Sequence, residues 1–316
     1  MRLPDYDLNY MGRKAHEMGF IRDSLEKVMR LADILEYCNT NPILKDSLAL
    51  KGGTAINLTV FNLPRLSVDI DMDYTKNVSL EEMLLNRERI NDIIEKYMAF
   101  HGYILSPKAR SQHSLDSWIY KYDNAGGNSD NIKLEVNYSL RAHILPLREH
   151  PIIAEHFLAD YEVRTLALIE IYASKIIALL SRAASRDLYD VRNMIDFGII
   201  KESEKTLLRK CVIFYAAVSV RNINKTFDTK AIDGIARQKI KTELQPVIRK
   251  QEDFELDVAK KLVKEYMSEL MNTSKDEKEF LDRFENKIYS PDLLFDDAKI
   301  IERIGQHPMA LWKTRL

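Results

Sequence analysis

The chain has 316 residues, of which 46% are hydrophobic and 30% are charged, and it carries a formal net charge of −1. These values predict a globular protein with a substantial core, in one large domain or two. The start of the chain has no apolar segment typical of a secretion signal, and the longest apolar run, 166–180, is broken by Glu170 and Lys175. We therefore expect neither secretion nor a membrane span.

The two cysteines and the uneven charge distribution bear on the location of the protein and on its partners. Cys38 and Cys211 lie far apart, which favours a reducing, cytoplasmic location over a disulfide framework. Residues 181–250 hold 15 Lys and Arg against 8 Asp and Glu. Such a basic segment could bind a polyanion beside an acidic metal site, and a solvated helical face would look the same. Charge leaves both readings open.

The N-terminal third is predicted as helix, strand, glycine turn, helix and strand. Apolar residues recur at helical spacing over 7–39. The short apolar strand 48–50 runs into the glycines 52–53, and a helix follows over 54–63. Clean alternation of polar and apolar residues then predicts a strand over 65–74.

One more helix and two strands precede a long helical half. A helix is expected over 80–99, with Ser79 as its N-cap, and strands over 117–122 and 132–139. After about residue 160 the strand signals fade and helical patterns dominate.

The fold class expected from this order is α+β, because a half built on a small sheet is followed by a half built of helices. We expect a boundary near 150–160. It divides the chain into a catalytic domain, 1–155, and a helical domain, 156–316, which contributes further site residues.

The most informative stretch is the glycine turn Lys51-Gly52-Gly53-Thr54. Glycine has no Cβ, so such a turn lets backbone amides and a hydroxyl approach a triphosphate. Asp69 and Asp71 follow at alternate positions of a strand, where their carboxylates share one face and can hold Mg²⁺. Either feature alone is common, but the combination predicts metal-dependent nucleotidyl transfer.

Glu135 is the natural third carboxylate of this site. It lies on an alternating strand, on the face opposite the apolar residues. If this strand pairs beside the aspartate strand, Glu135 would converge on the same metal ions. The alternative is a half-exposed glutamate balanced by Lys133, and the sequence leaves both open.

A fourth piece lies in the helical half. An amphipathic helix over 170–182 carries Lys175 and Arg182 on one face, and a second helix follows from Arg186, with Ser185 expected as its N-cap. Cations beside an acidic metal site would neutralise a triphosphate. The alternative, which the residues alone favour, is an ordinary ion-pair cluster at a helix start, formed by Arg186, Asp187 and Asp190.

Together these stretches resemble the AbiEii/AbiGii family of nucleotidyltransferase-like toxins, a branch of the polymerase-β-like superfamily. The matching segments are Leu50 to Ala55, Arg65 to Asp71, Lys133 to Asn137, Lys175 to Asp190 and Gln306 to Lys313. The resemblance implies a nucleotidyltransferase domain with a small mixed sheet, followed by an α-helical bundle. It also implies a toxin of a type IV toxin–antitoxin or abortive-infection system, whose antitoxin is usually a separate transcriptional repressor.

The resemblance further implies roles for single residues. Thr54 falls at the phosphate-binding hydroxyl, and Lys175 matches the lysine that contacts the nucleotide phosphates. Ser67 matches a serine that becomes phosphorylated in some relatives, which removes its free hydroxyl. The metal carboxylates and the acidic pair of the last motif fall on Asp69 and Asp71, and on Asp187 and Asp190. One departure is a threonine after the glycines, with fourteen residues between it and the first aspartate.

We therefore expect a Mg²⁺- or Mn²⁺-dependent nucleotidyltransferase toxin that uses NTP. Some relatives modify the 3′ end of tRNA, so RNA is the expected acceptor. The expected nucleotide-binding residues are Lys51, Gly52, Gly53, Thr54, Ser67, Arg182 and Arg186. Two alternatives stay open: an enzyme that modifies a small molecule or a protein, and an NTP-binding module without catalysis.

Overall fold

The computed structural model describes residues 6–153, 161–219 and 225–315. The chain forms two compact units. The first comprises residues 1–141, 147–165 and 246–252, and the second comprises 142–146, 166–245 and 253–316. Helices surround a mixed sheet in the first unit and make up the second, so the expected α+β class is confirmed. No helix of the described segments is long and apolar enough to cross a membrane.

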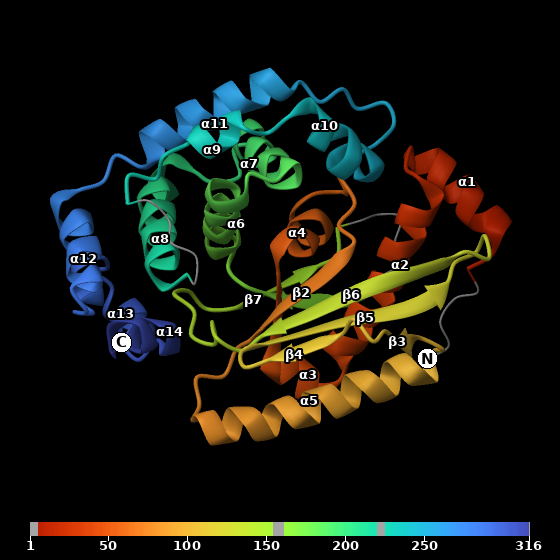
Figure 1. Ribbon diagram of the computed structural model, residues 1–316, viewed down its shortest axis with the longest axis horizontal. Helices are drawn as coiled ribbons and strands as arrows, with labels where there is room; N and C mark the ends of the chain where they lie inside the picture. Colours follow the sequence, from red (N-terminus) through yellow and green to blue (C-terminus); the bar gives the residue numbers. More distant parts are fainter. Residues whose placement is uncertain (1–5, 154–160, 220–224, 316) are drawn as a thin grey trace. The chain divides into compact units, whose positions relative to one another are not determined.

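A mixed sheet of eight described strands organises the first unit (Figure 1), in the order β3-β5-β6-β2-β1-β8-β7 with β4 beside β5. β2 runs antiparallel to β1 and parallel to β6. The strands are β1 Leu48–Lys51, β2 Asp69–Tyr74, β3 Ile104–Leu105, β4 Arg110–Gln112, β5 Leu115–Asp123, β6 Ser129–Asn137, β7 Arg148–Pro151 and β8 Glu162–Thr165.

The central strands bury one face, as their alternating sequences predict. Ile70 and Met72 of β2 and Leu134 and Val136 of β6 are buried, while the acidic residues between them face the other way. β3, β4, β7 and β8 were not expected from the sequence. They are two to four residues long. The residues of β3, β4 and β7 are mostly exposed, and β8 buries only Val163 and Thr165, so each strand is too short for an alternating pattern to be recognised.

Among its described residues, the first unit has five helices and a π-helical turn. They are α1 Leu8–Met18, α2 Arg22–Thr40, α3 Pro42–Ser47, α4 Gly52–Ala55, the turn η1 Ile56–Val60 and α5 Leu80–Phe100. α5 runs alongside the sheet (Figure 1). Its expected N-cap is confirmed, since the Ser79 side chain accepts a hydrogen bond from the Glu82 amide.

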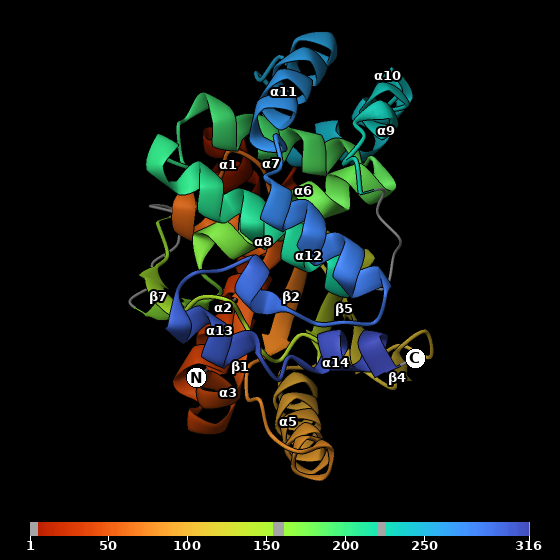
Figure 2. The same ribbon diagram turned by 90° about the vertical axis from the view of Figure 1, so that its left-hand side faces the viewer.

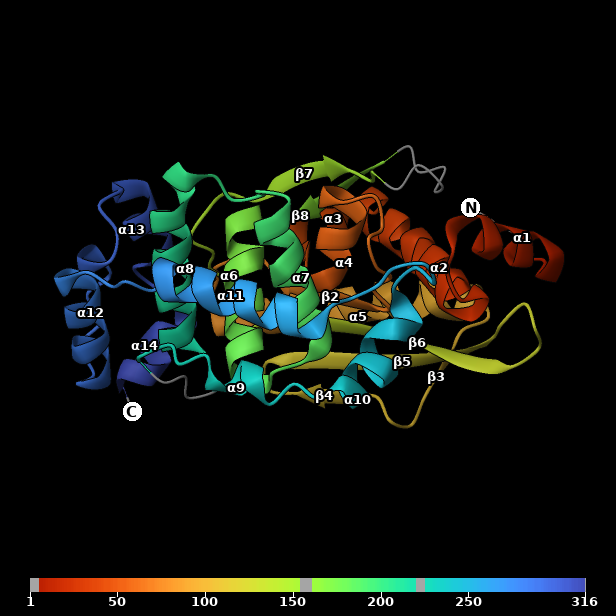
Figure 3. The same cartoon turned by 90° about the horizontal axis from the view of Figure 1, so that it is seen from above.

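The single N-terminal helix expected over 7–39 is wrong, because Gly19 ends α1 in the left-handed conformation with φ +74°. The chain then turns into α2, and Figure 3 shows the two as separate red helices. Glycine is favoured at this position because a side chain is strained at this φ, and a Cβ there would also displace the Gln251 side chain.

The second unit is helical. Its main helices are α6 Leu168–Arg182, α7 Ser185–Asp196, α8 Lys205–Val218, α11 Leu256–Leu270, α12 Lys275–Glu285, α13 Ala298–Ile304 and α14 Pro308–Arg315. Shorter pieces are η2 Glu202–Glu204, α9 Lys230–Asp233, α10 Arg237–Lys239, η3 Ile240–Leu244 and η5 Pro291–Leu293, and η4 Gln245–Val247 follows η3. α6 packs against α7 and α8. α12, α13 and α14 come toward the viewer in Figure 2.

Two polar contacts, one buried and one partly buried, tie distant segments of this unit together. The Glu170 carboxylate, at the start of α6, accepts hydrogen bonds from the backbone amides of Ile144 and Leu145, each at 2.9 Å. In α14, Lys313 donates to the carbonyls of Ala217 and Ser219, which end α8. A cation at a helix C-terminus satisfies carbonyls that lack helical partners.

Candidate active site

The glycine turn at the start of α4 brings polar side chains against its backbone. Gly52 has φ +72°, and a Cβ on it would lie 2.9 Å from Oδ2 of Asp71. A Cβ on Gly53 would lie 2.5 Å from Nη2 of Arg65 and 2.9 Å from Oγ of Ser67. Both positions therefore require glycine, the first for its conformation and its neighbour and the second for its neighbours alone.

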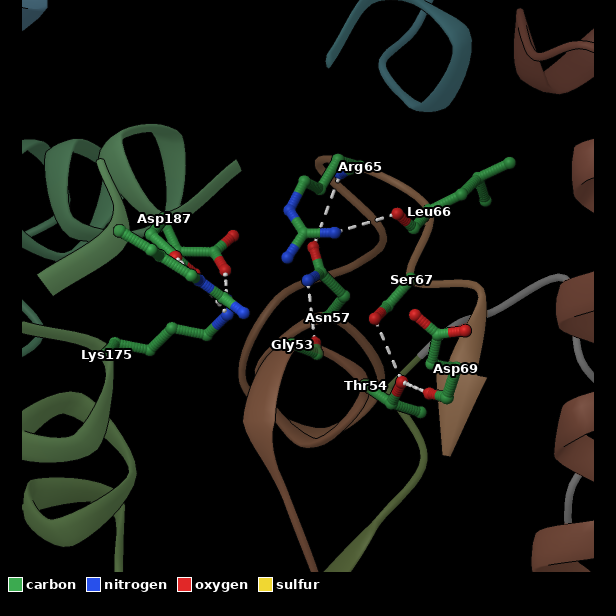
Figure 4. Close-up of polar contacts among 11 residues, drawn as sticks. Gly53, Thr54, Asn57, Arg65, Leu66, Ser67, Asp69, Lys175 and Asp187 are labelled. Atoms are coloured by element: carbon green, nitrogen blue, oxygen red, sulfur yellow. Dashed lines mark hydrogen bonds and ion pairs between the residues drawn. The ribbon is translucent and has the colours of Figure 1, made fainter. Parts of the chain in front are cut away.

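Thr54, the fourth residue of the turn, is 2% exposed and its hydroxyl faces the protein (Figure 4). This hydroxyl donates to the backbone carbonyl of Asp69 and lies 2.9 Å from the Ser67 hydroxyl. It thus joins the start of α4 to the start of β2. Its expected contact with a nucleotide phosphate stays a prediction.

Arg65 and Asn57 support the turn, and sequence reasoning gave neither a role. Asn57 donates to the Gly53 carbonyl at 2.7 Å and accepts from the Arg65 amide at 3.4 Å. The Arg65 guanidinium is buried and donates to the Leu66 carbonyl at 2.9 Å (Figure 4). The one sequence signal for this supporting role was the position of Arg65, two residues before Ser67.

Asp69 and Asp71 lie on the polar face of β2. In the parallel ladder with β6, Asp69 is opposite Lys133 and Asp71 is opposite Glu135. β6 therefore lies beside the aspartate strand, as the metal reading of Glu135 requires. The Lys133 ammonium is 2.9 Å from the Glu135 carboxylate, so the charge balance expected in the alternative reading is also present.

The pKa values of these groups reflect that pairing. Burial raises the pKa of Glu135, but hydrogen bonds from Lys133 and Ser117 outweigh it and hold the pKa below its usual value. Burial lowers the pKa of Lys133, and the neighbouring carboxylates of Glu135, Asp69 and Asp71 outweigh it and raise the pKa. Lys133 is thus the cation that balances this acidic face.

The two aspartates fit a magnesium ion, since Mg²⁺ is commonly held by one or two carboxylates together with waters and substrate phosphates. Asp71 faces Gly52 of the glycine turn, and a metal ion on Asp71 would meet a triphosphate there if the turn binds one. No three His, Cys, Asp or Glu side chains of the described segments are grouped to hold a metal ion by themselves. The roles of Asp69, Asp71 and Glu135 as metal ligands stay predictions.

Lys51, the first residue of the turn, forms an ion pair with Asp73. Asp73 is buried at the inner part of β2, and burial raises its pKa against the opposing effect of Lys51. This contact was not expected, because Asp73 shares its strand face with the two metal aspartates. The nucleotide-binding role of Lys51 stays a prediction.

In the second unit, Lys175 of α6 joins two aspartates of α7. Its ammonium lies 3.1 Å from Oδ1 of Asp187 and 2.9 Å from Oδ2 of Asp190. Arg182 donates to both carboxylate oxygens of Asp187, at 2.6 and 2.9 Å. Burial raises the pKa of Asp187, but Lys175 and Arg182 outweigh it and leave the pKa below its usual value.

This cluster unites four of the expected residues, and it orders the lysine and one arginine around a fully buried carboxylate. Arg186, also expected here, lies half-buried in the first turn of α7. The expectation that Ser185 caps α7 is wrong. Ala184 is the N-cap, and the buried Ser185 hydroxyl lies 3.1 Å from the Glu243 carboxylate, which holds the start of α7 to η3.

The fold and the glycine turn beside paired aspartates place the chain among the nucleotidyltransferases. The chain belongs to the AbiEii family, whose model, described as the nucleotidyl transferase AbiEii toxin of a type IV toxin–antitoxin system, matches residues 33–295. It is therefore a nucleotidyltransferase toxin, with NTP as its substrate and an antitoxin as its partner.

The solved structure of one similar protein supports the fold. MenT4, a nucleotidyltransferase toxin from Mycobacterium tuberculosis, aligns with 96% of this chain and 98% of its own, at a TM-score of 0.63 and 17% identity. A putative nucleotidyltransferase from H. pylori aligns with 77% of this chain and 92% of its own, at a TM-score of 0.44 and 16% identity. No curated protein sequence matches the chain.

Proposed function

We propose that this toxin transfers a nucleoside monophosphate from NTP to an RNA acceptor in a Mg²⁺- or Mn²⁺-dependent reaction, with the 3′ end of tRNA as the acceptor. The observation that supports the metal and nucleotide roles is the approach of Asp71 to the backbone of Gly52. A carboxylate next to a phosphate-binding turn is the arrangement that lets one metal ion bridge protein and triphosphate.

In this proposal the first unit binds the nucleotide. Asp69 and Asp71 hold the metal ion, with Glu135 beside Asp71 as a further ligand. The metal, when bound, neutralises charge that develops on the transferred phosphoryl group. The amides of Gly52 and Gly53 contact the triphosphate, because the absence of a Cβ opens their backbone.

The Lys175 cluster supplies fixed positive charge in the same proposal. Asp187 and Asp190 hold the Lys175 ammonium in one orientation, so little reorganisation is required when it meets a phosphate. Arg182 and Arg186 add to this charge. Asp187 accepts from both cations, so we assign it the role of orienting them.

The remaining parts of the proposal concern the setting. Residues 1–155 form the catalytic domain and residues 156–316 the helical domain that presents the lysine and arginines. The enzyme acts in the cytoplasm, where NTP and tRNA occur together. The antitoxin is a separate transcriptional repressor that counteracts the toxin without binding it.

The test is transfer of label from each of the four α-³²P-labelled NTPs to purified total RNA with Mg²⁺. Asp69→Asn/Asp71→Asn serves as the matched control, because it removes the charge and keeps the shape of both side chains. We expect label in the tRNA band with the native protein only. Equal label with the double variant would contradict the metal assignment. No label in any RNA would shift the assignment to a small-molecule or protein acceptor, or to a binding module without catalysis.

A further inference from the structure

The Thr54 hydroxyl has its only proton engaged inside the fold. A hydroxyl has one proton to donate, and a backbone carbonyl can only accept. The contact between the Thr54 hydroxyl and the Asp69 carbonyl therefore uses the Thr54 proton. In the second contact, at 2.9 Å, either hydroxyl can be the donor, so Ser67 is the donor there. Thr54 thus has no proton left to offer a phosphate.

The acceptor of that proton is the backbone of a proposed metal ligand. Asp69 is the first residue of β2. It directly follows the segment 65–68, which passes the glycine turn. A hydrogen bond to its carbonyl fixes the orientation of the peptide that follows Asp69. The direction of a Cβ is set by its backbone, so this bond also fixes where the Asp69 carboxylate points.

We propose that Thr54 is a positioning residue, which acts on the reaction through Asp69. We also propose that the Ser67 hydroxyl contacts the nucleotide phosphate by turning its proton away from the Thr54 oxygen, which keeps its own bond to the Asp69 carbonyl without it. Ser67 is half-buried, whereas Thr54 is 2% exposed. The Ser67 hydroxyl also lies against the open side of Gly53, together with the Arg65 guanidinium. A hydroxyl beside a guanidinium and a glycine backbone suits a phosphate oxygen. This inference rests on the proposed function.

Three full-length variants separate the two roles. Thr54→Val removes the hydroxyl at nearly constant shape, Thr54→Ser keeps the hydroxyl, and Ser67→Ala removes the proposed phosphate contact. The readouts are kcat and KM for NTP, and binding of Mn²⁺ alone, followed by its electron paramagnetic resonance signal. Asp69→Asn is the reference for a lost metal ligand. Thr54→Ala is measured as a second variant without the hydroxyl, and thermal unfolding selects the variant that keeps the fold.

We expect Thr54→Val to lower kcat at least tenfold and to weaken Mn²⁺ binding several-fold, with KM for NTP within twofold of the native value. Thr54→Ser should restore both, and Ser67→Ala should raise KM with native Mn²⁺ binding. A raised KM with native Mn²⁺ binding in Thr54→Val would overturn the inference, as would a Thr54→Ser variant that is no better than Thr54→Val. If the native protein transfers no nucleotide, the proposed function fails, while Mn²⁺ binding still tests the link from Thr54 to Asp69.

Discussion

Asp71 and Glu135 lie directly opposite each other in the parallel ladder of β2 and β6. Two carboxylates in this register would repel each other in isolation. The nearby Lys133 ammonium compensates for that repulsion, through its ion pair with Glu135 and its attraction to the aspartates. A protein cation thus occupies the electrostatic role that a divalent metal ion would take over.

Replacement of that cation is expected to lower the metal requirement. Lys133→Met removes one positive charge that competes with a metal ion for the acidic face, so half-maximal transfer should need several-fold less Mg²⁺. A titration of the transfer rate against Mg²⁺ measures this. Lys121→Met, on the exposed side of neighbouring β5, is the matched control and should leave the requirement unchanged. A higher requirement in Lys133→Met would show that Lys133 supports the metal site.

A side chain on the second turn glycine is expected to disturb both fold and activity. In Gly53→Ala, the new Cβ would meet the buried Arg65 guanidinium and the Ser67 hydroxyl, so the turn must shift at a cost of about 1–3 kcal/mol. Urea unfolding and the transfer assay measure the two effects.

Gly12→Ala is the control for that substitution. Gly12 lies within α1 with nothing within 4 Å of its Cβ position, so alanine there should stabilise the protein by about 0.5–1 kcal/mol. Native activity and stability in Gly53→Ala would mean that the turn is looser than its contacts indicate.

The ion pair between Arg87 of α5 and Asp116 of β5 is expected to stabilise the first unit strongly. The Arg87 guanidinium donates to both oxygens of the buried Asp116, at 2.8 and 2.6 Å. Arg87→Met leaves that carboxylate without its main partner, so the free energy of unfolding should fall by about 3–5 kcal/mol. The exposed pair of Lys96 and Asp92 in the same helix provides the comparison, since Lys96→Gln should change stability by less than about 0.5 kcal/mol. Equal losses of stability in Arg87→Met and Lys96→Gln, measured by urea unfolding, would contradict a strong contribution from the buried ion pair.

Asp187 is expected to make stability depend on pH in the acid range. Its pKa is lowered in the folded protein, so its contribution is fully present above the unfolded pKa of about 3.9. The contribution is lost as the pH falls through the lower, folded value. Urea unfolding of the native protein and Asp187→Asn should therefore differ by a constant amount between pH 5 and 7, and the difference should shrink below about pH 4. A difference that instead grows toward low pH would refute the ion-pair assignment.

The sequence predicts those features that rest on local patterns. The alternation in β2 and β6 and the apolar stripe of α6 are strong periodic signals, and the structure has these elements within a few residues of the expected bounds. The sequence left open whether β6 pairs beside β2, and the structure shows a parallel ladder between them. The strands β3, β4 and β7 could not be predicted because two to four mostly exposed residues show no periodicity, and the four residues of β8 are too few to establish one. The domain boundary at residues 155 and 156 stays a prediction.

The site residues divide in the same way. Aspartates at alternate positions are visible in the sequence, but a hydrogen bond from Thr54 to a backbone carbonyl has no signature in side-chain identity. The ion pair of Lys51 with Asp73 depends on the antiparallel register of β1 and β2, which also lies beyond local patterns. The Ser185 hydroxyl satisfied the rule for an N-cap, yet a tertiary contact with Glu243 competes with that role.

The first unit includes a short segment from late in the chain. Residues 246–252 belong to it, and the Leu66 amide donates to the Val247 carbonyl at 2.6 Å while Arg65 bridges to Ile248. The segment that leads into the two aspartates therefore gains two of its backbone contacts from residues about 180 positions further along. During synthesis, the ribosome must complete four-fifths of the polypeptide before that segment has its native neighbours. The unit that carries the glycine turn and the two aspartates thus completes its fold late in translation, even though most of it is encoded first.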